Sequence, residues 1–264
     1  MKKHFLFRRY AVACAVAGAL VIASSAGAAV IPAQSTSNEI TAKSGGDGTG
    51  ADSPVIDNAG STAYTSANLY VGGAGTGATP TGFPANERQA VSVLVFQLPA
   101  LAAGEAFDSA TLKVVTTAGS TPSQNIDVYG LGFRNANTLS TIDYFVGALD
   151  STDATLLTND FLAASSSTAS GVTLSTSGTS TSIASYLNQQ IANGAVAGSS
   201  YVFLRLNMDV FDTGSARLQI GGPGHGTASN RPVLEYTTAA VPEPSAFILA
   251  GPAIALLARR RRNG

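Results

Sequence analysis

The 264-residue chain has one cysteine, no tryptophan and two histidines, and only 12% of its residues are charged. Its cysteine, Cys14, lies in the first apolar stretch, so the rest of the chain has neither a disulfide nor a catalytic thiol. Beyond residue 28 the only histidine is His225, which excludes metal sites built from Cys and His. The body must fold on its hydrophobic core alone, and roughly 210 residues suffice for that.

Basic residues are scarce in the middle of the chain, because eight of the 15 lie in two clusters at its ends. All 16 acidic residues lie between these clusters, which leaves the body with a net charge of about −8 or −9. An acidic surface repels phosphate backbones, so we expect no nucleic acid among the partners.

The first 28 residues have the three parts of a secretory signal. Four basic residues come first: Lys2, Lys3, Arg8 and Arg9. An uncharged apolar run covers 10–23, and Ala26-Gly27-Ala28 supplies the small residues of a cleavage site. The pattern predicts a signal helix, passage through the Sec translocon and cleavage at Ala26 and Ala28. A retained membrane anchor is the alternative, although the run is short for a span.

The end of the chain also has three parts. Val241-Pro242-Glu243-Pro244 is followed by an uncharged run, 245–258, and then by an arginine cluster consisting of Arg259, Arg260, Arg261 and Arg262. Two closely spaced prolines favour an extended, accessible segment. The run has 14 residues, fewer than the ~20 of a comfortable span. Arginines after it are retained on the cytoplasmic side, so a chain exported from its N-terminus would stop here with its body outside.

This tail resembles the PEP-CTERM sorting signal of Gram-negative bacteria, over residues 241–264. The resemblance implies that an exosortase, a membrane protease-transpeptidase, recognises the motif and removes the hydrophobic sorting helix after a transient membrane insertion. It further implies that the protein ends at the cell envelope surface or outside the cell, with exopolysaccharide or biofilm matrix. A plain C-terminal membrane anchor is the alternative reading of the same segment.

The body, 53–238, follows a Ser-, Thr- and Gly-rich segment, 29–52, that we expect to be flexible. Short alternating or apolar runs bounded by Gly, Pro, Asn and Asp predict strands. They are 91–98, 110–116, 125–131, 201–206, 216–220 and 233–237. The long connections between them favour an all-β jelly-roll or Greek-key sandwich over simple hairpins.

Two short helices are predicted within this sandwich. Ile183, Leu187 and Ile191 form an apolar stripe between a capping Ser182 and a terminating Gly194. A second helix is predicted over 155–164, where Leu and Phe residues follow Asp153, a possible cap.

The body also resembles the DNRLRE-type jelly-roll modules, in three short stretches. These are Leu94 to Pro99 with the following Ser109-Ala110-Thr111-Leu112, the helical segment 183–194, and the closing Asn230 to Tyr236. The chain departs from that family at Tyr186 or nearby, where a tryptophan is usual. The resemblance implies a jelly roll attached to surface proteins, some of which bind carbohydrate.

Chemical groups in the body indicate few sites. His225 lies between glycines, which suits a loop better than a catalytic base. No cofactor is expected, although Ca²⁺ needs only oxygen ligands. Three groups of aspartates are candidates for it: Asp47, Asp52 and Asp57; Asp150 with Asp153; and Asp209 with Asp212. Tyr64 and Tyr70 are the tyrosines that the pattern leaves best exposed for a sugar.

The composition and the two ends therefore predict a non-enzymatic protein that is secreted or held at the cell surface. A carbohydrate-binding adhesion module is the first alternative, and a polysaccharide hydrolase or lyase is the second. Paired carboxylates would be needed for the second, and no spacing in the sequence singles out a pair.

Overall fold

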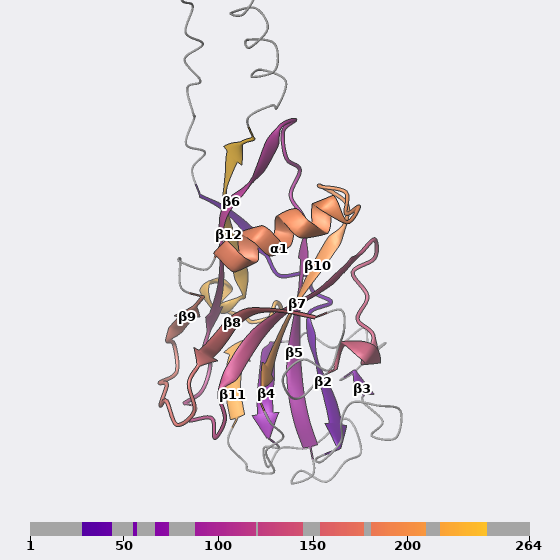
Figure 1. Ribbon diagram of the computed structural model, residues 1–264. Helices are drawn as coiled ribbons and strands as arrows, with labels where there is room; N and C mark the ends of the chain where they lie inside the picture. Colours follow the sequence, from indigo (N-terminus) through magenta and orange to yellow (C-terminus); the bar gives the residue numbers. More distant parts are fainter. Residues whose placement is uncertain are drawn as a thin grey trace, which may run out of the picture.

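Two antiparallel sheets pack as a sandwich in the computed structural model, with one α-helix beside them (Figure 1). The structure describes residues 28–43, 55–56, 67–73, 88–119, 121–144, 154–176, 181–209 and 217–241. The predicted β-sandwich is therefore confirmed for this part of the chain. The predicted signal and sorting helices lie outside the described residues.

The smaller sheet has four strands in the order β1-β12-β6-β9. Their bounds are β1, Ala29–Pro32; β12, Val233–Ala240; β6, Glu105–Val115; and β9, Thr173–Ser175. The first and last strands are neighbours, with Ala29 opposite Tyr236. The chain before β1 and the chain after β12 therefore leave from the same end of the sandwich.

The larger sheet has eight strands, if the two-residue β3 is counted. Its main path is β11 (Arg217–Gly221), β4 (Asn68–Gly73), β5 (Arg88–Gln97), β10 (Tyr201–Met208), β7 (Ile126–Arg134) and β8 (Thr155–Leu162). Beside this path, β2 (Asn38–Lys43) pairs with β5 and with β3 (Val55–Ile56). Two single turns of 3-10 helix, η2 (Thr141–Asp143) and η3 (Ala228–Asn230), lie in the connections.

Strand β5 has neighbours along both of its edges. Ser92 is paired with Glu39 of β2 and with Leu206 of β10, so these two strands flank β5. Ala90 is paired with Thr41 of β2 and with Gly72 of β4. Strands β4 and β10 consequently lie one after the other along the same edge. Strands β4 and β10 diverge from that edge. On the side of β4, an isolated β-bridge between Thr116 and Ile220 joins β11 to the end of β6 in the other sheet.

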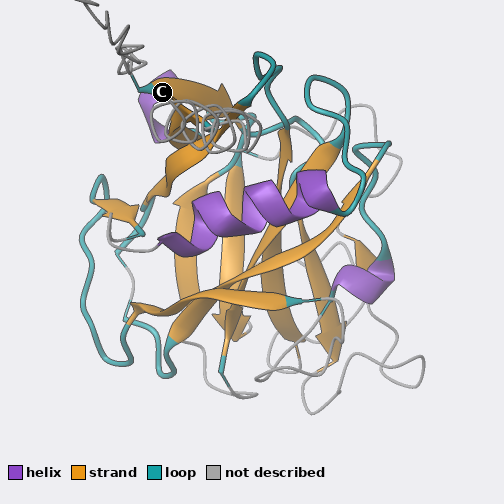
Figure 2. Cartoon of the chain, turned by 45° about the horizontal axis from the view of Figure 1, so that its top comes forward, coloured by secondary structure: helices purple, strands orange, loops and turns teal. Residues whose placement is uncertain are grey.

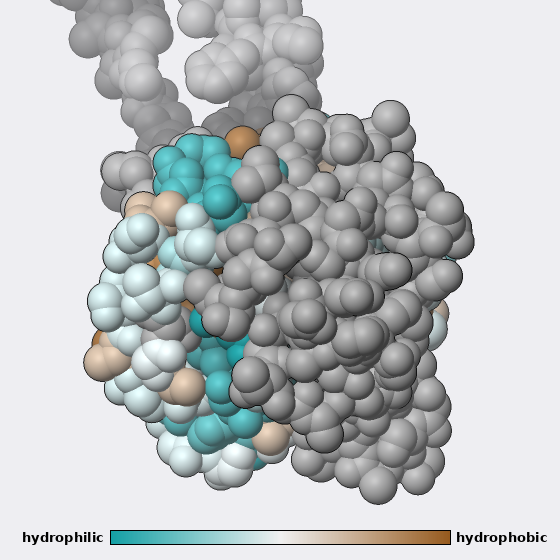
Figure 3. Space-filling view, turned by 90° about the horizontal axis from the view of Figure 1, so that it is seen from below, coloured by the Kyte–Doolittle hydropathy of each residue, from teal (hydrophilic) through white to brown (hydrophobic). Residues whose placement is uncertain are grey.

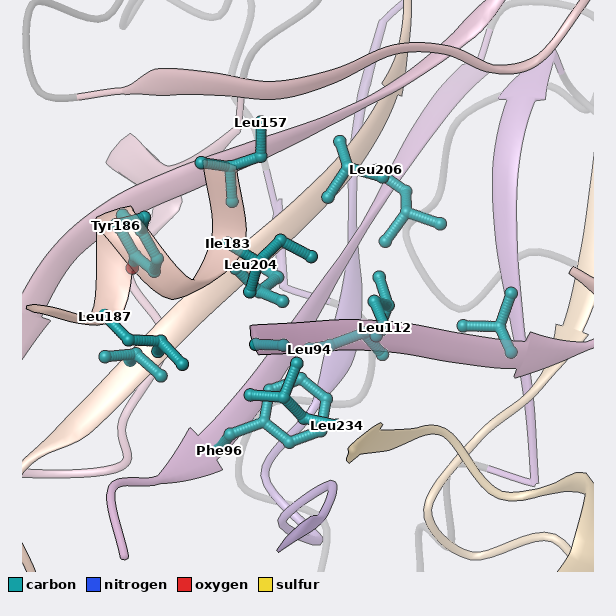
Figure 4. Packing of buried hydrophobic residues seen from close by; sticks show 14 of the residues in the cluster. Leu94, Phe96, Leu112, Leu157, Ile183, Tyr186, Leu187, Leu204, Leu206 and Leu234 are labelled. Carbon is teal, nitrogen blue, oxygen red and sulfur yellow. The ribbon is translucent and has the colours of Figure 1, made fainter. Parts of the chain in front are cut away.

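The main hydrophobic core lies between the sheets. Leu94 and Phe96 of β5 point toward Leu112 of β6 and Leu234 of β12 (Figure 4). The alternate residues of β5 belong to a second cluster on the opposite face of the larger sheet, which contains Ile40, Val91, Val93, Val95, Leu131, Leu139, Tyr144 and Phe203. Because both faces of β5 are buried, its sequence is almost continuously apolar, as the pattern predicted.

Helix α1, Thr181–Ala192, covers the core between β6 and the larger sheet (Figure 2). Its buried stripe consists of Ile183, Ala184, Tyr186 and Leu187, with Ile191 partly buried. The side-chain amide of Asn188 accepts the Phe107 N–H at 3.0 Å and donates to the Phe107 carbonyl at 2.9 Å. The helix thus supplies β6 with the hydrogen bonds that a further strand would make.

The helix prediction for 182–194 is confirmed, with one change at its start. The helix begins at Thr181, so Ser182 lies in its first turn and is not the residue that caps it. Gly194 has a φ of +107°, and its N–H donates to Ile191, which ends the helix as expected.

Two other predictions from the sequence are wrong. Residues 155–164 were expected to be helical, but Thr155–Leu162 forms β8, because these residues pair with β7 and bury Leu157 and Leu162 while leaving Leu156 exposed. Segment 29–52 was expected to be flexible, but its described part forms β1 and β2. Among the residues of these strands whose burial the structure describes, Ile31 and Ile40 are the buried hydrophobic ones, so the apolar signal was weak.

Tyr186 is the residue through which α1 contacts the larger sheet. Its ring lies over Gly130, and a Cβ at this position would be only 2.5 Å from the Tyr186 Cε2 atom. The Tyr186 hydroxyl lies within hydrogen-bond distance of the carbonyl oxygens of Leu131 and Phe203, and burial raises its pKa. Only glycine leaves room for this ring on the strand.

We expect Gly130→Ala to lower the free energy of unfolding by about 1–3 kcal/mol, since the added methyl group overpacks the site under Tyr186. The matched control is Gly132→Ala on the same strand, where a Cβ has no atom within 4 Å and the change should be close to neutral. Urea unfolding of both variants measures the difference. Equal stabilities for the two variants would contradict this account of the helix contact.

Candidate functional site

Three carboxylates meet at one end of the larger sheet. Asp127 lies on β7, Asp160 on β8, and Asp209 directly follows β10. One carboxylate oxygen from each residue lies within 4.8 Å of those of the other two. We call these three residues the acidic cluster. It is the group of metal-ligating side chains that the described part of the chain brings together.

A bulge in β8 brings Asp160 to the other two aspartates. Ile126 pairs with Leu162 and Val128 with Thr158, so three residues of β8 face Asp127 alone. Asp160 adopts a φ of +54°, in the left-handed region that few residues other than glycine enter. Its N–H donates to Asp127 Oδ1 at 2.8 Å. The bulge therefore turns the backbone N–H of Asp160 toward the buried carboxylate of Asp127, which accepts its hydrogen bond.

The environment of Asp127 favours its neutral form. The side chain is 2% exposed, and burial, followed by the hydrogen bond and the charge of Asp209, raises the pKa of Asp127 from 3.8 to about 6. The N–H of Asp160 and the hydroxyl of Tyr129 at 3.3 Å lower that pKa in part. Asp209 keeps a buried Oδ1 that makes no hydrogen bond. Two hydrogen-bond donors and a neighbouring carboxylate thus act on the pKa of Asp127 in opposite directions.

A buried arginine lies next to the cluster on the same face of the sheet. The guanidinium of Arg205 lies 5.2 Å from the ring centroid of Tyr129, and its Nε donates to Asn207 at 2.9 Å. Burial lowers the pKa of Arg205 to about 10, and burial with the charge of Asp127 raises that of Tyr129 to about 12. Tyr129 therefore stays a neutral phenol between a cation and a carboxylate.

A second guanidinium, that of Arg134, extends the row formed by Asp127, Tyr129 and Arg205. Arg134 makes a two-pronged ion pair with Asp143, whose backbone carbonyl accepts a hydrogen bond from Arg205 Nη1 at 3.2 Å. Arg134 also lies over the Phe203 ring, 4.4 Å from its centroid. Since the partners of both guanidiniums come from β7, β10 and the η2 turn, this row is a structural network rather than an open site.

The acidic cluster can hold a proton or contribute to a cation site. Carboxylate oxygens are the ligands that Ca²⁺ prefers, but three of them are fewer than the six to eight that it takes. Retaining glycosidases also use a pair of carboxylates, about 5 Å apart. However, Asp127 is buried and its two oxygens already accept from Asp160 and Tyr129, so a sugar has no access to this carboxylate.

No protein-family model and no curated protein matches this chain. What can be said of its function therefore depends on its own residues and their geometry.

The predicted calcium ligands are only partly in view. Asp209 is close to Asp127 and Asp160. Its predicted companion Asp212, and Asp47, Asp52, Asp57, Asp150 and Asp153, lie outside the described residues. Sequence reasoning missed Asp127 and Asp160. A signal existed for Asp127, because aspartate is uncommon inside a strand and here it alternates with Ile126 and Val128.

His225 lies in the loop between β11 and β12, as the sequence predicted. Its Nδ1 accepts the Thr227 N–H at 3.0 Å, and its carbonyl oxygen accepts from Arg231 Nε at 2.9 Å. The imidazole thus stabilises a turn.

Tyr70, a candidate sugar platform, is half-buried on β4, and the guanidinium of Arg217 lies 3.9 Å from its ring centroid. This contact covers one face of the ring. Tyr64, the other candidate, lies outside the described residues.

The residues predicted to be processed lie at or beyond the limits of the described chain. Ala28 is exposed and directly precedes β1, and Val241 directly follows β12. Ala26 and the remaining residues of the sorting motif, Pro242, Glu243, Pro244, Arg259, Arg260, Arg261 and Arg262, lie outside the described residues.

Among the residues that the structure describes, no helix is both long and apolar enough to cross a membrane.

We predict that Asp127 makes the protein less stable as the pH rises from about 4 to about 6. The folded state has the higher pKa, so it binds the proton more tightly than the unfolded chain, and this contribution is lost as Asp127 ionises. The loss amounts to at most about 3 kcal/mol, the equivalent of a two-unit shift.

Urea unfolding at several pH values, compared with Asp127→Asn, measures this contribution. The difference in free energy of unfolding between the wild type and Asp127→Asn should fall across that pH range. The matched control is Asp108→Asn, a change at an exposed residue outside the cluster, and the difference between the wild type and this variant should not fall. Parallel pH curves for wild type and Asp127→Asn would overturn the prediction.

Proposed function

We propose that this chain is an exported, non-enzymatic protein of the cell surface or extracellular matrix of a Gram-negative bacterium, and that an exosortase processes its tail. The observation that carries the proposal is the order of three features in 241–264: the Val-Pro-Glu-Pro motif, the short apolar run and the arginine cluster. Together with a secretory signal in residues 1–28, they give a chain inserted from both ends with its body outside.

The position of the last strand supports this function. Strand β12 ends at Ala240, and the N–H of Val241 donates to the Gly104 carbonyl at 2.6 Å. The sorting motif therefore begins where the sheet's hydrogen bonds stop. Removal of the residues that follow would leave every strand of the sandwich in place.

The first strand gives matching support at the other end. Strand β1 begins at Ala29, directly after the expected cleavage pattern Ala26-Gly27-Ala28. Signal cleavage would thus leave an N-terminus whose first residues belong to a sheet in the folded protein. Pairing with β12 would hold this new N-terminus in place.

The jelly-roll or Greek-key topology is the finer part of the proposal. Strands that are far apart in sequence lie side by side, as β1 and β12 do, and β10 lies between β5 and β7. Helix α1 lies between β9 and β10 in the chain, at the place where the resemblance to DNRLRE-type modules expects a helical stretch. These features favour a module of that type.

A matrix role suits the polar outer face of the smaller sheet. There Lys113 is paired with Glu235 at 2.7 Å, and the hydroxyls of Ser109 and Thr237 share a hydrogen bond of 2.7 Å. Hydroxyl and charged groups on the outer face of a sheet suit hydrated exopolysaccharide, which we take as the partner. The proposal involves no cofactor and no catalytic residue.

The proposal predicts that the mature surface form lacks the arginine cluster. Mass spectrometry of the protein recovered from the surface of its own host should give a chain that begins near Ala29 and ends before Arg259. An intact arginine cluster would contradict sorting and favour a plain membrane anchor.

A pair of variants tests which residues the processing enzyme reads. Pro242→Ala combined with Pro244→Ala should leave the tail uncleaved, because the motif loses its extended, accessible form. Asn263→Ala, a change in the same tail outside the motif, should be processed normally. Equal processing of the two variants, measured by the mass of the mature chain, would rule out recognition of the motif.

A further inference from the structure

The end of the sandwich from which both chain termini leave has an unusual surface. It consists of 100–106 at the β5–β6 connection, 196–198 after helix α1, and 239–241 at the end of β12, which we call the terminal cap. Of its 13 residues only Glu105 is charged, and the others are Ala, Gly, Val and Leu. The carboxylate of Glu105 accepts the Ala102 N–H at 3.2 Å within its own turn.

The terminal cap is continuous and exposed. Ala240 pairs with Glu105 and Ala239 with Ala106, so the end of β12 lies beside the β5–β6 connection. A Cβ on Gly198 would be 3.5 Å from that of Ala100, which places the third segment against the first. Val196 and Val241 are 59% and 50% exposed. An apolar surface of this kind indicates a contact that the described chain does not itself supply.

The acidic cluster lies at the opposite end of the sandwich. Strand β10 begins at Tyr201, three residues after the cap, and Asp209 follows its other end, about 25 Å away at 3.3 Å per residue. Seen from that opposite side, the described surface shows gathered hydrophilic residues and only scattered hydrophobic ones (Figure 3). The sandwich is therefore polarised along its strands: it is apolar where the termini leave and polar at the far end, which carries the acidic cluster together with basic residues such as Arg217.

We infer that, before the tail of the chain is removed, the terminal cap rests on a lipid bilayer, so that the sandwich stands on the membrane with the end that holds the acidic cluster outward. In the sequence, an uncharged apolar run lies before the sandwich, at 10–23, and another lies after it, at 245–258. Basic residues stand next to both runs. A run inserted into the bilayer tethers the cap close to lipid. The tether raises the effective concentration of lipid at the cap, so a weak apolar contact suffices for docking. Anionic headgroups repel carboxylates, and this orientation keeps the carboxylates of the acidic cluster away from the headgroups.

The inference depends on the membrane insertion contained in the proposed function. It is tested with the full chain carrying Cys14→Ser, reconstituted into phosphatidylethanolamine and phosphatidylglycerol vesicles. An environment-sensitive nitrobenzoxadiazole label is attached at Ala103→Cys in the cap or at Ala169→Cys. Ala169 is a matched exposed alanine at the far end of β6, where its carbonyl accepts from Thr116. Spin-labelled lipid then quenches labels close to the bilayer.

We expect the label at position 103 to be quenched several-fold more strongly than the label at position 169. Val196→Glu should reduce the quenching at position 103, because it places a charge in the cap. Ile142→Glu, a change at a 74% exposed apolar residue outside the cap, should leave it unchanged.

Three other results would overturn the inference, and they separate it from the proposed function. If the chain floats with the vesicles but both labels are quenched equally, the tail inserts and the cap does not touch lipid. If the chain does not float, insertion and docking both fail. If the emission of the label at position 103 shifts with protein concentration in the absence of vesicles, the cap binds a second copy of the chain instead of lipid.

Discussion

The structure depends on one constraint: β5 must be buried on both faces and hydrogen-bonded along both edges. Val91, Val93 and Val95 face one cluster, while Leu94 and Phe96 face the main core, and all of them are 0% exposed. A strand in this position tolerates no unpaired backbone group. Strands β2, β4 and β10 meet that requirement together, and the divergence of β4 from β10 lets β11 reach the end of β6.

A chain with so few charged and aromatic residues must obtain its stability from such packing. The helix shows how closely the fit is set, since the ring of Tyr186 occupies the space that a side chain on Gly130 would take. Asn188 on the same helix completes the edge of β6. A polar side chain thus pairs backbone groups that no neighbouring strand reaches.

Periodicity in the sequence predicted most of the sandwich. Alternating or continuous apolar runs marked β5, β6, β7, β10, β11 and β12, and the stripe at Ile183 and Leu187 marked α1. Strand β8 was missed because Leu156-Leu157 and Phe161-Leu162 are doublets, a spacing that also suits a helix. Its bulge at Asp160 breaks the period of two, and only pairing with β7 reveals the strand.

The acidic cluster could not be predicted for a related reason. Its members are separated by 33 or more residues in the chain, and they meet through the register of β7 between β8 and β10. Sequence order favoured neighbours such as Asp209 and Asp212 instead. The proposed processing motifs differ in this respect, because each consists of consecutive residues and can be recognised in the sequence whatever the fold between them.

The pairing of β1 with β12 has a consequence for the order of events during synthesis. More than 200 residues separate Ala29 from Tyr236, so the smaller sheet cannot close until nearly the whole chain is available. Contacts this distant form slowly, because a long loop must close before they contribute. A chain that threads through a translocon from its first residue would therefore lack β12, and with it a complete sandwich, for most of its passage. The pairing that joins both ends of the folded sandwich thus leaves an incomplete chain without its smaller sheet.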